Sequence, residues 1–527
     1  MHDRRFPRDG FASHDVRDGT AAASAGTTHD ASHTGARDGP ARALARAVRD
    51  ASTRAGSGIY LGHADGAWCA APPEHAVLVL GPPRSGKTSG FVVPNLLAAA
   101  GPVVSTSTKP DVMAATAGVR RDVGRCLLFD PSGTVPCPPS VSPVRWSPVQ
   151  AAATWDGALG AARVLVLAAG GGAGGVRAEQ SHWTERAQAL LAPLLFAAAV
   201  DGAAMRTVLA WVDRRQSLPA QAVLAATREP GAGVAADLLA GVAETDPREL
   251  SGIWSTASGA LAGLRSAAAL AATDEPDFEP AHFVESADSL YVVAPAERQA
   301  LVAPLVAGLV DAVRAATYER AGGPVGGARV PVLLALDEVA NIAPLPALPA
   351  MVSEGGGQGL LTLACLQDLS QARHRWGDQA DGFSSLFGTT VVLPGIGDVA
   401  TLEALSVLAG EVEVPVRTLS AGRGPTGRSV LDLVTGGRAH TGAAVTTQWR
   451  RRLPPDVVAA GAPGHALAFD ERNRPRWVPL APAHRTEPWR SLVAHARARD
   501  AEASLVTRQP TLGRADGRPW RADGLGR

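Results

Sequence analysis

The chain has 527 residues, which leaves room for up to about three and a half domains of roughly 150 residues each. Apolar residues make up 46% and charged residues 19%, so the chain can bury a large core, and disorder along its whole length is excluded. Its 50 basic and 50 acidic side chains cancel, which excludes a uniformly polycationic protein and confines any contact with DNA to a local channel or loop.

The cysteines and the apolar stretches bear on the compartment. The four cysteines have neither the spacing of a zinc knuckle nor that of a disulfide framework, which favours a reducing, cytoplasmic compartment. The first 15 residues, MHDRRFPRDGFASHD, contain no apolar segment of a signal peptide. The most apolar stretches, near 91–104 and 187–200, are interrupted or too short for about 30 Å of hydrocarbon, so we expect no membrane-spanning segment.

Both ends of the sequence are polar. Residues 1–55 contain almost no large apolar side chains, and residues 485–527 are similar, with nine arginines against five acidic residues. Such compositions do not bury enough apolar surface to fold, so we expect a disordered tail at each end. The C-terminal tail has a charge suited to DNA or acidic lipid, but a solubilising tail has the same composition, and we assign it no role.

Between the tails, seven short runs of apolar and β-branched residues predict strands. They are Ala76–Leu80, Pro102–Thr106, Cys126–Asp130, Ser289–Ala294, Val330–Asp337, Leu360–Gln367 and Thr390–Pro394. These runs are apolar throughout, which is typical of strands covered on both faces. Since helical runs separate them, the sequence predicts an α/β fold with a mostly parallel sheet.

The alternation of strands and helices breaks between Pro143 and Pro280. This stretch is dense in Ala and Leu and shows helical spacing from Trp183 to Leu194. We expect residues 143–283 to form an all-α domain that is inserted between two parts of one nucleotide-binding domain. Those two parts are expected to be residues 56–142 and 284–484.

Two further elements are predicted near the end of the second part. The stretch Ser420–Thr447 is rich in Gly, Ser and Thr and indicates a mobile loop. The runs HALAFD and PRWVPL, separated by Glu471–Arg474, predict a closing β-hairpin.

The motif GPPRSGKT, Gly81–Thr88, follows a predicted strand and precedes a run that can form a helix. It matches the phosphate-binding pattern G-x-x-x-x-G-K-[ST] in the required strand, loop and helix order. Glycines let such a loop turn so that its N–H groups point at phosphate, and the helix dipole adds to this attraction. We expect Lys87 to contact the β- and γ-phosphates of ATP and Thr88 to ligate Mg²⁺. The expected nucleotide-binding residues are Gly81, Pro82, Pro83, Arg84, Ser85, Gly86, Lys87, Thr88 and Ser89.

A second motif, VPVLLALDEVANI, carries two carboxylates. The apolar strand delivers Asp337 and Glu338 at its C-terminal edge, where α/β sheets place their ligands. Asp337 can hold the Mg²⁺ ion, and Glu338 can orient or deprotonate the attacking water. This pairing favours hydrolysis of a nucleoside triphosphate over transfer of phosphate to a small molecule.

Two other positions remain open between a functional and a structural interpretation. Gln367 ends a predicted strand, where it either senses the γ-phosphate or begins a surface helix. Of the 50 basic residues only Lys87 and Lys109 are lysines, which suggests that both positions need a compact point charge. Lys109 either contacts phosphate or pairs with Asp111 to hold its turn.

Several blocks of the sequence occur in an order that resembles a known family. In chain order they are IYLGHADG, GPPRSGKTSGFVVPNLLAA, GPVVSTSTKPD, CLLFDPSG, RWSPV, HWTERAQALLAPLLFAA, LYVVAP, LLALDEVANIAPLPALP, SEGGGQGLLTLACLQDLSQARHRWG and LPGIGDVATLEALSVLAGE. Over about residues 58–484 the chain resembles the TraG/TraD-type conjugative coupling proteins of type IV secretion systems. The order of the blocks makes this resemblance far more specific than the phosphate-binding loop alone.

The resemblance implies a hexameric ring ATPase related to FtsK and HerA motors, with a RecA-like nucleotide domain and an all-α domain that selects substrate. Such a protein moves DNA with its attached relaxase toward the secretion channel, at the inner face of the cell membrane. Carried over to this sequence, Gly81–Thr88 is the nucleotide loop, Asp337 and Glu338 form the second motif, and Gln367 is the sensor. The catalytic residues are then expected to be Glu338, Lys87 and Gln367.

This sequence departs from the family pattern in two ways. Family members commonly carry N-terminal transmembrane helices, and we expect this chain to reach the membrane through partners. Many members also carry an arginine in a G-R-x-x-G segment where this sequence reads Gly355–Gly359. The arginine finger is therefore unassigned among Arg373, Arg375 and Arg417, each of which is also suited to an ion pair or a surface position.

Three functions compete at this point. The first is an ATP-driven DNA translocase that couples a relaxase–DNA complex to the channel. The second is a nucleotide-binding scaffold that recruits secretion substrates without motor activity, and it does not need a water-activating glutamate. The third is a small-molecule kinase, which is expected to show a lid and an acceptor pocket, and the sequence carries no such signature.

Overall fold

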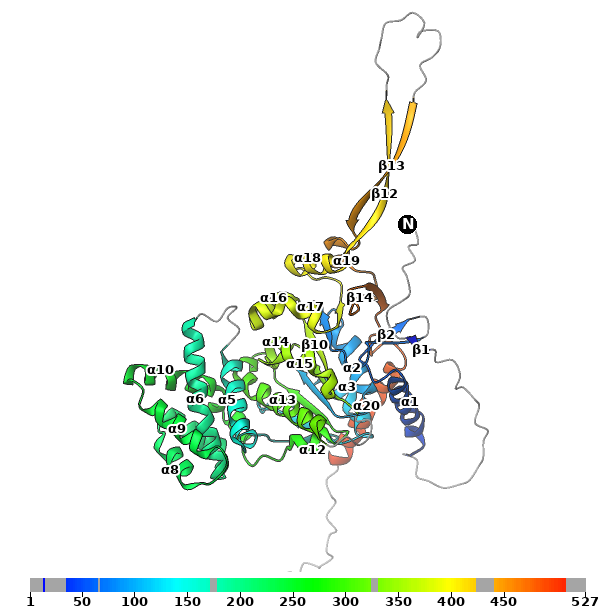
Figure 1. Ribbon diagram of the computed structural model, residues 1–527. Coiled ribbons are helices and arrows are strands. Elements are labelled where there is room, and N and C mark those ends of the chain that lie inside the picture. The colour runs from blue at the N-terminus through cyan, green and yellow to red at the C-terminus, as the bar shows by residue number, and fades with distance from the viewer. Residues whose placement is uncertain are drawn as a thin grey trace, which may run out of the picture.

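A ten-stranded sheet forms the centre of the molecule in this computed structural model, which describes residues 13–14, 35–64, 67–170, 178–323, 330–422 and 440–508 (Figure 1). The strand order is β15-β14-β11-β4-β10-β9-β5-β8-β6-β7. The strands are β4 (Val77–Leu80), β5 (Val103–Ser107), β6 (Cys126–Phe129), β7 (Ser142–Pro143), β8 (Ser289–Val293), β9 (Val332–Leu336), β10 (Leu360–Leu366), β11 (Thr389–Val392), β14 (His465–Phe469) and β15 (Pro475–Pro479).

The pairing of these strands matches the predicted α/β fold. Every pair from β11 to β7 is parallel, whereas β14 pairs antiparallel with β11 and with β15. All seven predicted strands are present, and the predicted closing hairpin is β14–β15. The continuous apolar runs were informative because the residues of β4, β5, β8, β9 and β10 are buried on both faces.

Two hydrophobic cores lie on opposite faces of the sheet. In β4, Leu78 and Leu80 belong to one core and Val77 and Val79 to the other, as expected for side chains that alternate along a strand. The first core includes helices α13 (Gln299–Gly322), α14 (Val339–Ile342), α15 (Leu348–Glu354), α16 (Leu369–Trp376) and α17 (Phe383–Leu386). The second includes α1 (Gly35–Arg54), α2 (Val93–Ala98), α3 (Asp111–Arg120) and α20 (Trp489–Arg508).

Helix α13 is the one helix of the described residues with the length and hydropathy of a membrane span. Of its most apolar window, 61% is buried inside the molecule. Val306, Leu309 and Val310 of this helix are fully buried in the first core. Its apolar composition is therefore explained by packing under the sheet.

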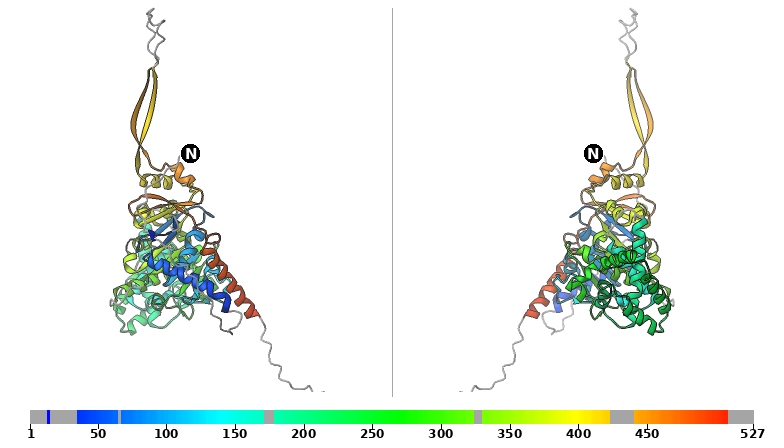
Figure 2. Two further views of the ribbon diagram at one scale, coloured as in Figure 1. Left: turned by 90° about the vertical axis from the view of Figure 1, so that its right-hand side faces the viewer. Right: turned by 90° about the vertical axis from the view of Figure 1, so that its left-hand side faces the viewer.

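The described residues from Pro148 to Val284 form helices joined by loops, without a strand among them, and they lie to one side of the sheet (Figures 1 and 2). They are α4 (Pro148–Ala151), α5 (Trp155–Ala169), α6 (Ala178–Val200), α7 (Met205–Asp213), α8 (Leu218–Ala226), α9 (Ala232–Ala243), α10 (Pro247–Ala260), a short turn of helix at Ala262–Arg265, α11 (Ala267–Ala271) and α12 (Pro280–Val284). Helix α5 begins at a Thr154 cap, whose hydroxyl accepts a hydrogen bond from the Gly157 N–H at 3.1 Å. Helices α5 and α6 pack on each other, and α5 also packs on α13.

The prediction of disordered tails is wrong for parts of both ends. Helix α1 buries Ala45 and Val48, and α20 buries Trp489, Leu492 and Ala496 against the second core. The two helices lie side by side (Figure 2). Their apolar side chains are few but recur at helical spacing, which is enough to dock a helix on a preformed core. Residues 1–12, 15–34 and 509–527, where tails were also predicted, lie outside the described residues.

The mobile loop predicted at Ser420–Thr447 is also corrected in part. Its two ends belong to β12 (Glu411–Gly422) and β13 (His440–Arg451), which pair antiparallel and project from the body (Figure 1). The alternating sequence EVEVPV of β12 carried a strand signal that the Gly/Ser/Thr content concealed. Residues 423–439 lie outside the described part. At the base of this hairpin lie α18 (Val399–Leu408) and α19 (Pro455–Ala460).

A small three-stranded sheet completes the fold. It consists of β1 (Ser13–His14), β3 (Ala67–Ala70) and β2 (Tyr60–Ala64), paired in that order. Strand β2 is fixed to the helix that follows the phosphate-binding motif, because the Asn95 side chain accepts from the Tyr60 N–H at 2.8 Å and donates to its carbonyl at 3.0 Å.

Candidate active site

The segment Gly81–Thr88 forms a tight loop between β4 and a helical run that comprises a π-helical turn (Thr88–Val92) and α2. Backbone φ is positive at Arg84 (64°) and at Gly86 (104°), a conformation that glycine adopts without strain. A Cβ at Gly81 would lie 2.6 Å from the Ser85 hydroxyl and 2.8 Å from the Leu393 Cβ. The loop therefore needs its glycines, one for conformation and one for space.

Lys87 lies inside this loop and is only 8% exposed. Its ammonium group donates hydrogen bonds to the carbonyl oxygens of Gly81 and Pro82, the latter at 3.0 Å. A buried ammonium held by two carbonyl dipoles still has a third donor, and no carboxylate of the described residues pairs with it. The loop thus presents a cation to an anionic ligand.

Asp337 follows β9 and meets the loop. Its carboxylate accepts a hydrogen bond from the Thr88 hydroxyl at 2.6 Å, and the Thr106 hydroxyl donates to its backbone carbonyl at 3.3 Å. Burial raises the pKa of Asp337, the nearby Glu338 raises it further, and the hydrogen bond from Thr88 opposes the shift. The two residues predicted to ligate Mg²⁺ are therefore in direct contact although 249 positions separate them.

Glu338 has a left-handed backbone, with φ 52° and ψ 48°, at the start of helix α14. This conformation is unusual for a residue with a Cβ and is found mostly where the surroundings impose it. The Asn341 amide donates to the Glu338 carboxylate at 3.3 Å. Glu338 lines the same pocket as Asp337.

These residues line one pocket of about 490 Å³ at the carboxyl ends of β4, β5 and β9. Its walls are formed by Pro83–Ser89, Val93, Ser107–Lys109, Asp111, Val112, Ala115, Asp337, Glu338, Ala483, His484, Val493 and Arg497. The structure thus brings together Lys87, Thr88, Asp337 and Glu338. The volume is that of a small-molecule site, and the position is the usual one for ligands of α/β sheets.

The donor set of the pocket fits a magnesium nucleotide. The Thr88 hydroxyl and the Asp337 carboxylate are hard oxygen ligands, and the described residues contain no cluster of three or more His, Cys, Asp or Glu suited to a metal ion. Mg²⁺ commonly binds through one or two protein oxygens, with water and phosphate oxygens completing its shell. The charge of Lys87 suits a phosphate chain, and a bound cation would offset the charge of the buried Asp337 carboxylate.

Gln367 lies at the end of β10, between β4 and β9, so the strands on which the sensor prediction depended are neighbours. Its backbone N–H donates to the Gln371 side chain at 2.8 Å. Gln367 is not among the residues that line the pocket. Its role as a γ-phosphate sensor stays a prediction.

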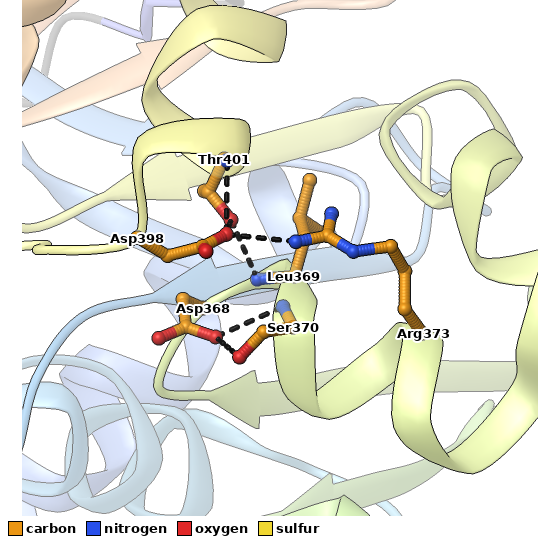
Figure 3. A network of polar contacts seen from close by, with 6 residues as sticks. All are labelled: Asp368, Leu369, Ser370, Arg373, Asp398 and Thr401. Atoms are coloured by element: carbon orange, nitrogen blue, oxygen red, sulfur yellow. Dashed lines mark hydrogen bonds and ion pairs between the residues drawn. The ribbon is translucent and has the colours of Figure 1, made fainter. Parts of the chain in front are cut away.

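The segment after Gln367 is held by a polar network (Figure 3). The Asp368 carboxylate accepts a hydrogen bond from the Ser370 N–H at 2.9 Å and caps α16. The Leu369 N–H donates to the Thr401 hydroxyl at 3.0 Å, and the Thr401 N–H donates to the Asp398 carboxylate at 2.9 Å. Hydrogen bonds from Thr401 and Arg373 lower the pKa of Asp398, which outweighs the effect of its burial.

The candidate arginine fingers are not equivalent. Arg373 forms an ion pair with Asp398 at 2.8 Å (Figure 3), and Arg375 donates to the carbonyl of Ala168 in α5 at 2.7 Å. Burial lowers the pKa of Arg375. Arg417 lies on the projecting strand β12, and its side chain is outside the described part. Arg373 and Arg375 thus have structural partners within their own chain.

For Lys109 the structure favours one of the two interpretations. Lys109 lines the pocket, and in the described part of the chain it makes no ion pair with Asp111. The Asp111 carboxylate instead accepts the Val112 N–H at 2.9 Å, at the first turn of α3. Lys109 therefore presents a second lysine charge to the pocket.

Sequence reasoning missed the residues that come from the C-terminal end. Val493 and Arg497 line the pocket, although residues 485–527 were assigned no role, and so do Ala483 and His484 just before them. The available signal was the helical spacing of Trp489, Leu492, Val493 and Ala496.

The chain is similar to several known proteins. Residues 30–431 match the family model described as Type IV secretory system Conjugative DNA transfer. A conjugal transfer protein TraG of Escherichia coli is 27% identical over 331 residues, which cover 58% of this chain and 49% of that protein. The chain thus spans about half the length of this curated relative.

Solved structures share the fold. The unbound bacterial conjugative coupling protein TrwBdeltaN70 has a TM-score of 0.60 at 18% identity, covering 83% of this chain and 90% of that one. The plasmid coupling protein TrwB in complex with ADP and Mg²⁺ has a TM-score of 0.56 at 19% identity, covering 78% and 86%, respectively.

Proposed function

Because the chain belongs to the type IV secretory system conjugative DNA transfer family, we propose that it is an ATP-hydrolysing DNA translocase. In this role it is a coupling protein, which links a relaxase–DNA complex to a type IV secretion channel. The observation that carries the proposal is the single pocket that contains Lys87, Thr88, Asp337 and Glu338.

Each of these side chains has a distinct task in hydrolysis. Lys87 contacts the β- and γ-phosphates and balances their charge. Thr88 and Asp337, already 2.6 Å apart, hold Mg²⁺, which when bound neutralises charge on the phosphate oxygens. Glu338 accepts the proton of the attacking water or orients that water. A platform that only binds nucleotide does not need this glutamate, which favours the motor over the recruitment scaffold.

Support for the nucleotide comes from the neighbours in fold. TrwB has been solved with ADP and Mg²⁺, and its phosphate-binding fold is shared by this chain. We assign ATP and Mg²⁺ to the corresponding pocket of this chain on the geometry of its own residues. The nucleotide-binding residues are proposed to be Gly81–Ser89.

The partners follow from the family. We propose DNA, the relaxase and components of the secretion channel as partners, and a homo-hexamer as the active form. The helical residues 143–283 are proposed as the domain that selects substrate, between the two parts of the nucleotide-binding domain, 56–142 and 284–484. We place the protein in the cytoplasm, at the inner face of the membrane, where partners hold it.

The test is the ATPase rate of the purified chain with and without single- and double-stranded DNA, together with its mass in solution. We expect stimulation by DNA and a hexamer. Lys87→Ala should lose ATP binding or hydrolysis. Glu338→Gln should bind ATP and hydrolyse it more slowly by about a hundredfold or more, since loss of a general base costs about 10²–10⁴-fold. ATP binding without hydrolysis by the wild-type chain under all these conditions would favour the scaffold.

A further inference from the structure

The C-terminal helix α20 forms one wall of the pocket. Val493 and Arg497 line it and lie four residues apart, which places them on one face of the helix. Ala483 and His484, just before α20, line it as well. The Ala483 N–H donates to the carbonyl of Ser89 at 2.7 Å, so this segment is hydrogen-bonded to the helical turn that follows the phosphate-binding loop.

Helix α20 is fixed on both sides of its pocket-lining face. Trp489 is fully buried, and its indole N–H donates to the Tyr60 hydroxyl at 3.2 Å. Arg499 donates to the Gly118 carbonyl at 2.7 Å and pairs with Asp122 at 2.9 Å. A Cβ at Gly118 would lie 2.3 Å from the Ala496 carbonyl oxygen, so α3 and α20 touch through their backbones. The pocket wall is therefore a packed element of the fold.

The arginines of α20 differ in their partners. Arg490 pairs with Glu487 at 2.7 Å, and Arg499 pairs with Asp122. Arg497, by contrast, has no carboxylate partner within the described residues, and it is the one of these three that lines the pocket. The pocket that Arg497 lines also contains Lys87, and a guanidinium is suited to phosphate oxygens.

We propose that α20 completes the nucleotide site, and that Arg497 donates hydrogen bonds to the phosphate chain. The inference rests on the proposed function, because it extends the same site. Docking of the C-terminal helix and binding of the nucleotide are then linked, since each supplies contacts to the other.

Equilibrium binding of a fluorescent ATP analogue with Mg²⁺ to the full chain tests the proposal. Arg497→Ala should weaken binding roughly tenfold, which corresponds to about 1.4 kcal/mol for a lost charged hydrogen bond. Arg497→Lys should keep part of the affinity, and Arg497→Glu should lose more than the alanine variant. Arg490→Ala is the matched control, because it removes an arginine of the same helix outside the pocket, and it should bind like the wild type.

A second measurement is amide hydrogen exchange in helix α20. In the wild-type protein, ATP should slow the exchange of the amides near Val493–Arg497, and in Lys87→Ala it should not. Circular dichroism and thermal unfolding of Arg497→Ala should match those of the wild type, because the side chain is exposed and contributes no packing.

The outcomes separate this inference from the proposed function. If Lys87→Ala loses binding while Arg497→Ala and Arg490→Ala both bind like the wild type, α20 is not part of the site and the nucleotide assignment stands. If Lys87→Ala binds as tightly as the wild type, the phosphate-binding loop is not the nucleotide site, and both the proposed function and this inference fail.

Discussion

Glu338 offers a direct test of how far this fold is strained at the pocket. Its left-handed backbone, φ 52° and ψ 48°, carries a Cβ that clashes with the following carbonyl in this conformation. Glu338→Ala keeps the Cβ and the strain, whereas Glu338→Gly removes both. We therefore expect the glycine variant to be the more stable of the two, the reverse of the usual order.

The difference in stability between the two variants combines three effects. The Cβ of alanine in a left-handed conformation destabilises the fold by about 1–2 kcal/mol. Glycine avoids this strain, but it destabilises the fold by about 0.5–1 kcal/mol because it loses more conformational entropy on folding. Glu338 is also the N-cap of α14, with the Asn341 N–H donating to its carbonyl at 2.9 Å, and alanine is a poorer N-cap than glycine. The net advantage of glycine is about 1 kcal/mol, or about 2 °C in the midpoint of thermal unfolding.

The assay is thermal unfolding of the two variants in the same buffer, followed by circular dichroism. Glu185 supplies the control, because it is exposed inside helix α6, where glycine should be less stable than alanine by about 1 kcal/mol. Glu338→Gly and Glu338→Ala should both bind ATP and fail to hydrolyse it at the wild-type rate. A glycine variant at position 338 that is less stable than the alanine variant would refute the strain argument.

Three other predictions concern charge and assembly. Burial raises the pKa of Asp337, so this residue lowers the stability of the fold as the pH rises from the ordinary pKa of 3.8 to the raised pKa. Asp337→Asn removes this effect and should have a higher midpoint of thermal unfolding than the wild type. The difference between the two midpoints should grow with pH over this range. If the chain is the proposed translocase, a few arginines on loops neutralise DNA phosphates, so binding of random DNA, measured by fluorescence anisotropy, should weaken steeply with salt and show little sequence preference. Tight, salt-insensitive binding by a monomer contradicts this. If an arginine of a neighbouring subunit completes the site in the proposed hexamer, ATPase activity per subunit should rise strongly with protein concentration or with a DNA template. Full activity in a monomer that sedimentation identifies excludes a shared site.

The sheet and the phosphate-binding loop were predictable because their signals are local. A strand buried on both faces, such as β10, is apolar at every position, and the loop needs a fixed glycine and lysine spacing. The edge at which Asp337 and the loop meet also follows from the sequence, since parallel strands end on the same side. Their contact at 2.6 Å depends on strand order, which the sequence alone does not determine.

The C-terminal wall was not predictable by the same reasoning. Helix α20 is polar on average, and its four buried side chains matter only because α3 and β2 present a surface that fits them. Position 118 needs a glycine because the backbone of Ala496, 378 positions away in the chain, lies against it, and no local sequence pattern reveals this contact. The polar composition of residues 485–527 therefore predicted a disordered tail, whereas packing against the core forms helix α20 and one wall of the pocket.

The two departures from a stable arrangement lie next to each other in the chain. Asp337 keeps a buried carboxylate with a raised pKa, and Glu338 keeps a left-handed backbone. We expect a neutral residue at position 337 and a glycine at position 338 to raise the stability of the fold, and stability alone then does not account for this pair. A bound cation would offset the charge of Asp337, and Glu338 lines the same pocket as Lys87. The stability cost at these two positions is therefore best explained by the proposed binding and hydrolysis of a nucleotide in this pocket.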